Sequence, residues 1–488
     1  MRRGVLLVSL LVLPSLVLAQ MVELGQGLLR GERGQQSDRY LGVPYAAPPL
    51  AEKRWQKPGA APGWDGIRTA DAFGPACAQV GNFYADNNPE SFGKVYGSED
   101  CLYLNIWTPA GGTPISAKPV LVFIHGGGGI AGAASMPAYD AERLAARANA
   151  VVVTFNYRLG VFGNLYVPAL HRGDPVSDSG YFSLLDQIAA LRWVQDNINQ
   201  FGGDPARVTV MGHSFGAISV WLLMRSPLAT GLFQQAISLS GIPLTGQLKH
   251  LLRHGEAVVE RLGEEHLEGT ALREALHSKN TDELIEAGRG IKLEKPMIDG
   301  TVLVADGEGL LNSVPTMLGS TGNEASLLLY IKGEEDRLRL WRLGRQDEVA
   351  RDALISSFAL MGLRTKSSVY NLVVNKALDS AADQIVASGQ NSWRYRFVWD
   401  NYPEPWKSVF GSFHGLDVPF IFGNFAEDGS SYDGFVWKSG TREERERLHR
   451  QWVHHLKHFL YTGQPDDDSW SGWQQNNHIK IFGEMPGE

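Results

Sequence analysis

The 488-residue sequence has few of the features that mark nucleic-acid-binding, fibrous or disordered proteins. It contains 45 Lys and Arg against 53 Asp and Glu, which gives a net charge of -8, and it has no block of basic residues. Nucleic-acid binding depends on a positively charged surface, so we expect no nucleic-acid partner. Hydrophobic residues make up 43% of the chain and charged residues 20%, close to the usage of globular proteins.

Only the N-terminus has an apolar run that approaches the length of a membrane span. Arg2 and Arg3 precede an apolar run from Val5 to Leu18 that ends at Ala19. This run is shorter than the roughly 20 residues of a membrane span, and a small residue stands where a signal peptidase would cut. We therefore expect a signal peptide over residues 1–19 and a secreted or periplasmic mature protein without a stable membrane anchor. A twin-arginine export signal is the alternative.

Cysteine is scarce, with Cys77 and Cys101 as the only two. Oxidising compartments favour disulfides, so the expected export predicts one bridge between them. Two buried free thiols are the other interpretation.

Nearly continuous apolar runs recur along the chain, as is typical of strands buried on both faces. They predict strands at 120–124, 151–155, 207–211, 235–239, 316–319 and 393–399. Helical patterns at 184–199 and 217–224 flank the third run, and this alternation predicts a mostly parallel sheet covered by helices on both faces. The polar stretches 246–290 and 334–384 are interpreted as helical cap insertions. No repeat or long linker divides residues 20–488, so we expect a single α/β domain.

The segment Gly212-His213-Ser214-Phe215-Gly216 joins a predicted strand to a predicted helix and has the G-x-S-x-G form of a nucleophile elbow. The turn is so tight that side chains in place of the glycines would clash, and the serine takes a strained backbone that projects its hydroxyl. The pattern alone arises easily by chance, so its position between strand and helix carries the prediction. The other interpretation is a glycine-rich turn with a structural serine.

A second glycine-rich loop, His125 to Gly129, follows the strand predicted at 120–124. Its bare amides can stabilise the oxyanion of a tetrahedral intermediate together with the amide of Phe215. The residues Gly127, Gly129 and Gly132 also match a dinucleotide-binding pattern. That function is disfavoured because the next strand ends at Asn156 rather than at an acidic residue and no clear helix follows the loop.

Together with further motifs, these segments resemble the type-B carboxylesterases, the α/β-hydrolase family that also contains the cholinesterases. The resemblance extends over nearly the whole mature sequence. The matching segments are 40–45 with Pro48 and Pro49, 98–106, 125–128, 156–158, 197–205, Ser240 with Gly241, and 298–300.

The resemblance implies an α/β-hydrolase fold and a catalytic triad of Ser214, Glu324 and His414. Glu324 lies in a segment, 319–326, similar to the one that carries the family's acid, and His414 lies in one, 413–423, similar to that of the family's histidine. The order serine, acid, histidine is the one this fold uses. In this scheme His414 takes the proton of Ser214, while Glu324 fixes the tautomer and stabilises the imidazolium.

The resemblance also implies supporting roles for other residues. They are the amides of Gly127, Gly128 and Phe215 as oxyanion donors, Ser240 and Asp417 as a hydrogen-bonded pair behind the triad, Arg54 and Glu99 as a structural ion pair, and Cys77 with Cys101 as the family's first disulfide loop.

Four positions depart from the family pattern. His213 and Phe215 stand where the family has Glu and Ala beside the nucleophile, Gly129 replaces an aromatic residue, and Ala325 replaces a glycine. None removes a catalytic atom, because an oxyanion donor is a backbone amide. They affect the choice of substrate, and His213 is either a packing residue or one that reshapes the pocket.

The function implied is a serine carboxylesterase that hydrolyses uncharged small to medium carboxylic esters through an acyl-enzyme. The partner is a small-molecule ester, and no cofactor is expected. His454 and His458 lie one helical turn apart, but no third ligand accompanies them, so we expect no metal site. The alternative is a non-catalytic, hydrolase-like binding or adhesion protein. The sequence leaves the physiological ester and the oligomeric state open.

Overall fold

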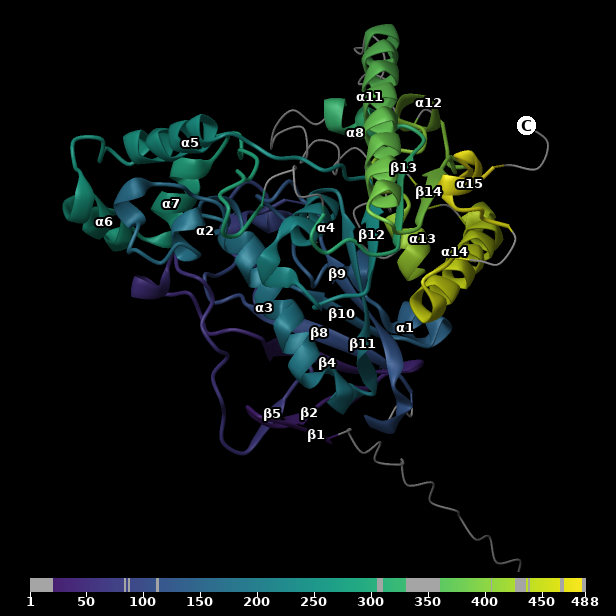
Figure 1. Ribbon diagram of the computed structural model, residues 1–488, viewed down its shortest axis with the longest axis horizontal. Helices are drawn as coiled ribbons and strands as arrows, with labels where there is room; N and C mark the ends of the chain where they lie inside the picture. Colours follow the sequence, from purple (N-terminus) through teal and green to yellow (C-terminus); the bar gives the residue numbers. More distant parts are fainter. Residues whose placement is uncertain are drawn as a thin grey trace, which may run out of the picture.

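A ten-stranded sheet lies at the centre of the protein, with helices on both of its faces (Figure 1). The computed structural model describes residues 21–82, 85–86, 88–110, 114–304, 310–330, 360–404, 406–425, 436–437, 439–465 and 469–484. The signal peptide expected over residues 1–19 lies outside these ranges. The expected mostly parallel sheet between two helical layers is confirmed.

The strands of the sheet run in the order β15, β14, β13, β12, β11, β9, β10, β8, β4, β3. Their bounds, in the same order, are Ile479–Phe482, Ser392–Phe397, Thr316–Thr321, Gln235–Leu239, Gly203–His213, Lys118–Ile124, Val151–Phe155, Tyr103–Pro109, Ser37–Pro44 and Glu32–Arg33. All neighbours from β15 to β10 are parallel, whereas β8, β4 and β3 extend the sheet antiparallel.

The six predicted strands are all present, as β9 to β14. The sequence patterns missed β3, β4, β8 and β15, which lie at or toward the edges of the sheet. The run predicted at 393–399 was too long, because β14 ends at Phe397.

Two hydrophobic cores lie on opposite faces of the sheet, and alternate residues of the central strands feed them. In β9, Val120, Val122 and Ile124 belong to one core, whereas Leu121 and Phe123 belong to the other. A strand buried on both faces must be apolar throughout, and this accounts for the continuous runs in the sequence.

The first core is covered by α3 (Phe182–Asn197), α4 (Phe215–Arg225) and α11 (Leu360–Ala387), and the second by α1 (Glu142–Ala148), α13 (Val418–Phe422) and α14 (Arg442–Thr462). Shorter helices near the sheet are α2 (Gly160–Gly163), α8 (Glu324–Tyr330), α12 (Trp406–Phe410) and α15 (Trp473–Asn476). None of the described helices has both the length and the apolar character needed to cross a bilayer.

The stretch 246–290 forms a separate helical group beside the sheet, as expected (Figure 1). Its helices are α5 (Leu248–Arg261), α6 (Gly269–Ser278) and α7 (Thr281–Gly288). The described part of the stretch 334–384 is not the cap insertion that was expected. The C-terminal part of α11 packs on the sheet through Leu378, Ala382 and Ile385, so this helix belongs to the crossover between β13 and β14.

A disulfide joins Cys77 to Cys101, with a distance of 4.9 Å between their Cα atoms. The loop that it closes contains the short pair β6 (Gln79–Val80) and β7 (Val95–Tyr96). A second small sheet of β1 (Met21–Leu24), β2 (Gly27–Arg30) and β5 (Ile67–Thr69) lies at the bottom of Figure 1.

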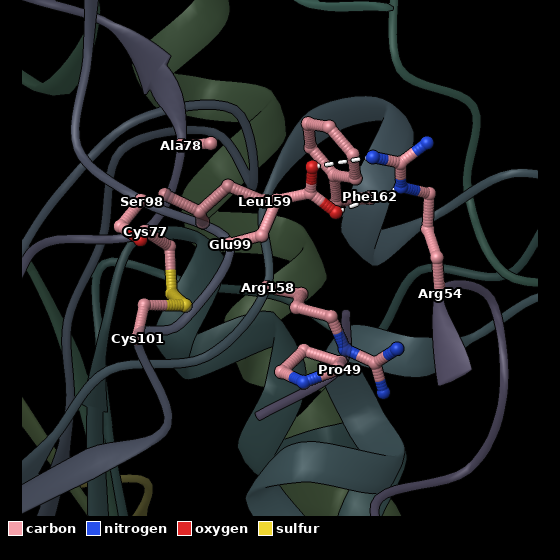
Figure 2. Close-up of a pocket in the computed structure, with 10 residues that line it drawn as sticks. All are labelled: Pro49, Arg54, Cys77, Ala78, Ser98, Glu99, Cys101, Arg158, Leu159 and Phe162. Carbon is pink, nitrogen blue, oxygen red and sulfur yellow. Dashed lines mark hydrogen bonds and ion pairs between the residues drawn. A yellow bond between two sulfur atoms is a disulfide. The ribbon is translucent and has the colours of Figure 1, made fainter. Parts of the chain in front are cut away.

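The ion pair of Arg54 and Glu99 lies beside the disulfide, across a small pocket (Figure 2). The Arg54 guanidinium donates to both oxygens of Glu99 at 2.7 and 2.6 Å, and both side chains are buried. Arg54 also donates to the carbonyl of Lys279, and Thr281 donates to Glu99. The pair therefore ties the disulfide loop to α6 and α7.

Replacing both Cys77 and Cys101 by serine is expected to lower the free energy of unfolding by about 3 kcal/mol, because the 24-residue separation sets the entropy that the bridge removes from the unfolded chain. Urea denaturation of the variant and the oxidised parent measures this difference. Peptide mapping under non-reducing conditions should recover the linked pair, and recovery of two freely alkylated thiols from exported protein would contradict the bridge.

Candidate active site

The turn from β11 into α4 places Ser214 at the carboxyl end of the sheet. Ser214 precedes α4 and has φ of 56° and ψ of -116°, a strained conformation for a residue with a side chain. A Cβ atom at Gly212 would overlap the carbonyl of Gly216, and one at Gly216 would overlap the carbonyl of Ile124 in β9. Both positions of the motif therefore require glycine, because the main-chain atoms that a Cβ atom would overlap cannot move aside.

The loop that follows β9 passes directly beside Ser214. A Cβ atom at Gly126 would lie 3.0 Å from Cβ of Ser214. Gly127 and Gly128 have φ of 106° and 67°, and within the described part of the chain their amides donate to no protein group. Phe215 is the first residue of α4, where an N–H group has no partner inside the helix. Among the described residues, these three amides thus have no acceptor, and the loop that carries two of them lies against Ser214.

Glu324 begins α8 directly after β13, and its side chain is almost completely buried. One carboxylate oxygen accepts hydrogen bonds from the Ser240 hydroxyl and the Thr321 amide, both at 2.6 Å. The other oxygen binds Nδ1 of His414. Ser240 itself has φ of 57° at the end of β12, so a second strained residue supports the carboxylate.

Hydrogen bonds hold the loop that carries His414 against the start of α8. The Asn323 amide donates to the carbonyl of Ser412 at 2.8 Å, and the Asn323 side chain donates to that of Phe410 at 3.0 Å. The Ser326 hydroxyl also donates to Phe410, at 2.7 Å. Residues on both sides of Glu324 therefore fix the histidine loop. Sequence patterns gave no signal for this role of Asn323 and Ser326.

Burial and charge act in opposite directions on the pair of Glu324 and His414. Burial alone would lower the pKa of His414, but the charge and hydrogen bond of Glu324 outweigh it and leave this pKa raised. Burial would raise the pKa of Glu324, and His414 with the two other donors leaves it lowered. The carboxylate is thus arranged to stabilise an imidazolium. Nε2 of His414 is buried and has no hydrogen-bond partner among the described residues.

The expectation that Ser240 and Asp417 form a hydrogen-bonded pair is wrong. Ser240 donates to Glu324, whereas Asp417 accepts from the Tyr395 hydroxyl at 2.9 Å. Burial, and then the nearby Glu324, raises the pKa of Asp417 to about 6. The missed partner is Tyr395, a residue of β14 whose role had no sequence signal.

His213 packs against the histidine expected to act as base. The ring centroids of His213 and His414 are 4.8 Å apart, and the rings are inclined by 39°. Burial, and then the neighbouring His414, lowers the pKa of His213, so its imidazole is neutral. This side chain forms part of the wall behind the site and brings no charge to it.

The side chain of Phe215 occupies the space next to Gly129. A Cβ atom at Gly129 would lie 2.6 Å from the Phe215 ring and 2.8 Å from a methyl group of Leu293. The two departures at positions 129 and 215 are therefore linked, because a larger side chain at 129 would collide with the ring at 215.

Comparison of this chain with known proteins assigns it to a family. The model of the carboxylesterase family matches residues 18–357. The chain is 32% identical to para-nitrobenzyl esterase of Bacillus subtilis, with 83% of each protein covered. The chain belongs to the carboxylesterase family. This carboxylesterase is also 32% identical to fumonisin B1 esterase of Sphingopyxis macrogoltabida, over 94% of its own length and 86% of that protein.

Solved structures agree with the sequence comparison. A thermophilic para-nitrobenzyl esterase has a TM-score of 0.77 at 29% identity and covers 95% of this carboxylesterase and 96% of that chain. A carboxylesterase of Geobacillus stearothermophilus has a TM-score of 0.75 at 31% identity, with 94% and 96% covered. The carboxylesterase therefore has the α/β-hydrolase fold and is a carboxylic ester hydrolase.

Among the described residues, no three His, Cys, Asp or Glu side chains are grouped so that they could hold a metal ion. His458 is one of the two histidines that lie one helical turn apart, and its Nδ1 lies 2.8 Å from the carbonyl of Gln464.

Activity is expected to rise with pH through the raised pKa of His414, above the ordinary value of about 6.5, and to stay high, because a base must be neutral. In Glu324→Gln the attraction that raises this pKa is lost while burial remains, so the midpoint moves to lower pH and kcat falls. Profiles of kcat/KM for p-nitrophenyl butyrate between about pH 5 and 9 measure both effects.

The exposed Glu256→Gln is the matched control and should keep the parent midpoint. An activity maximum below about pH 5, or an unchanged midpoint in Glu324→Gln, would contradict the assignment of His414 as the base.

Proposed function

We propose that this carboxylesterase hydrolyses small to medium uncharged carboxylic esters through an acyl-enzyme formed on Ser214. The observation that carries the proposal is the hydrogen-bonded chain from Ser240 through Glu324 to His414 at the same edge of the sheet as Ser214 and three free amides. Nucleophile, base, orienting acid and oxyanion donors are the groups that acyl transfer needs.

In this mechanism the Ser214 hydroxyl attacks the ester carbonyl and gives its proton to Nε2 of His414. The Gly127, Gly128 and Phe215 amides hold the oxyanion, and the imidazolium then protonates the departing alcohol. Water, deprotonated by His414, releases the acid. Nε2 has no hydrogen-bond partner in the described part of the chain, and we infer that its hydrogen bond with Ser214 forms when the substrate is bound.

The names of the relatives support ester hydrolysis without narrowing the acid or the alcohol. They include esterases of para-nitrobenzyl esters and of fumonisin B1, and a fatty acyl-CoA hydrolase of Anas platyrhynchos. A non-catalytic binding protein is not favoured, because these relatives are hydrolases and this chain keeps a serine at the elbow.

We further propose that the protein is exported, that residues 1–19 are removed as a signal peptide, and that residues 20–488 form one domain. Two features support export: the apolar run after Arg2 and Arg3, and the pairing of Cys77 with Cys101 in a disulfide.

Ser214→Ala is expected to lower kcat by on the order of a million-fold with the fold intact, because only binding and the oxyanion donors remain. The parent should release a burst of p-nitrophenol from a short-chain ester, and the variant should not. Labelling of the parent by an organophosphonate at a serine other than Ser214 would refute the assignment of the nucleophile.

Choline esters are expected to be poor substrates. His213 stands where a carboxylate would precede the nucleophile, and no tryptophan lies between Cys77 and Cys101 to face a cation. Loss of a nearby anion and of an aromatic face weakens binding of a quaternary ammonium by up to about a hundred-fold. We expect kcat/KM for butyrylcholine to lie well below that for an uncharged butyrate with a similar leaving group. Equal values, or inhibition by micromolar tetramethylammonium, would show that another group binds the cation.

A further inference from the structure

A cavity of about 460 Å³ lies beside the oxyanion loop. Four segments contribute to its lining: the start of the disulfide loop around Gln79, the oxyanion loop at Gly128 and Ile130, the start of α2 at Gly160 and Val161, and the end of α7 with the chain that follows, Gly288 to Leu293. Gln79 joins the first two segments, because its side chain accepts from the Gly132 amide at 2.8 Å and donates to the Gly132 carbonyl at 2.9 Å. The cavity thus has a fixed wall on the side of the oxyanion loop.

The cavity is adjacent to the position of a reacting ester. Gly128, one of the expected oxyanion donors, is part of its lining. Two residues earlier in the same loop, Gly126 lies against Ser214, and Leu293 of the opposite wall approaches the same point as the Phe215 ring. A chain attached to an ester at Ser214 can therefore extend past Gly128 into this space.

The charges on the cavity are all of one sign. Among the described residues, its lining contains Arg289 and Lys292 and no Asp or Glu, and the remaining lining residues are apolar or neutral. Arg289 is partly engaged, because it pairs with Glu286 at 3.0 Å and donates to the carbonyl of Gly93 at 2.8 Å. Its Nε is nevertheless buried without a partner among the described residues.

Lys292 differs from Arg289 because its side chain is exposed. Within the described part of the chain, no carboxylate pairs with its ammonium group, and only its main-chain carbonyl is engaged, with Nδ1 of His254. A free cation at the wall of a cavity attracts an anionic group that enters it.

We propose that this cavity binds a carboxylate carried by the ester substrate, at the far end of either its acyl or its alcohol chain, with Lys292 and Arg289 as the cationic partners. The proposal rests on the proposed function and extends the substrate class beyond uncharged esters. A half-ester of a dicarboxylic acid has this chemistry on the acyl side, and an ester of a hydroxy acid has it on the alcohol side.

Two pairs of substrates test the proposal in a pH-stat assay at neutral pH. Monoethyl adipate against ethyl heptanoate places the charge on the acyl side, and 4-(butyryloxy)butanoate against pentyl butyrate places it on the alcohol side. In at least one pair the charged ester should have a kcat/KM about 2- to 5-fold above that of its neutral match, within the range of an exposed ion pair. The preference should shrink as salt is raised from about 0.05 to 0.5 M.

Lys292→Gln should bring the preferred pair close to parity. Lys295→Gln, three residues later, exposed and outside the cavity lining, is the matched control and should keep the parent ratio. The proposal would be overturned if, in both pairs, the neutral ester were preferred or the two esters were hydrolysed equally well. It would also be overturned if the preference for the charged ester survived in Lys292→Gln. Failure to hydrolyse the neutral esters at all would instead refute the proposed function, so the two failures are distinguishable.

Discussion

The site depends on how closely three backbone segments approach one another at the carboxyl end of the sheet. The elbow around Ser214 touches its own helix at Gly216, and Gly216 touches the end of β9 at Ile124. Since these contacts are between main-chain atoms, they fix the distance from the Ser214 hydroxyl to the amides that follow β9. The chain connections from β9 and β11 diverge to opposite sides here, which is where ligands bind in open parallel sheets. The positive φ of Ser214 is the strain that accompanies this close approach.

A buried carboxylate is tolerable only when donors surround it, and the loop architecture around Glu324 supplies them. Ser240 comes from the end of β12, the Thr321 amide from the end of β13, and His414 from the loop beyond α12. Two strand ends and one loop thus converge on one side chain. Asp417 shows the opposite case, because among the described residues it has a single donor, Tyr395, and one oxygen without a partner, and its pKa is raised. The larger number of donors therefore gives Glu324 a lowered pKa, whereas that of Asp417 is raised.

Patterns in the sequence predicted the central strands and the elbow because these depend on local features: continuous apolar runs, and glycines at fixed spacing around a serine. The strands at or toward the edges of the sheet, β3, β4, β8 and β15, were missed, since their burial depends on segments distant in the chain. Glu324 and His414 followed only from the family resemblance, because nothing in their local sequence separates them from 53 acidic residues and 13 histidines. Partners chosen by tertiary packing, such as Tyr395 for Asp417, could not be predicted from a single sequence.

Phe215 and Gly129 show why isolated departures from a family pattern are difficult to interpret from sequence. Each alone changes the size of a side chain at the site, yet the ring of Phe215 fills the volume that a side chain at 129 would need. The exchange keeps an aromatic ring near the oxyanion loop but attaches it to α4 instead of the loop. Leu293, in the chain after α7, lies near the same point beside Gly129. The Phe215 ring therefore also borders the segment that carries Arg289 and Lys292. Under the function proposed here, the place where α4 and the chain after α7 meet is therefore the part of the wall that would select the substrate.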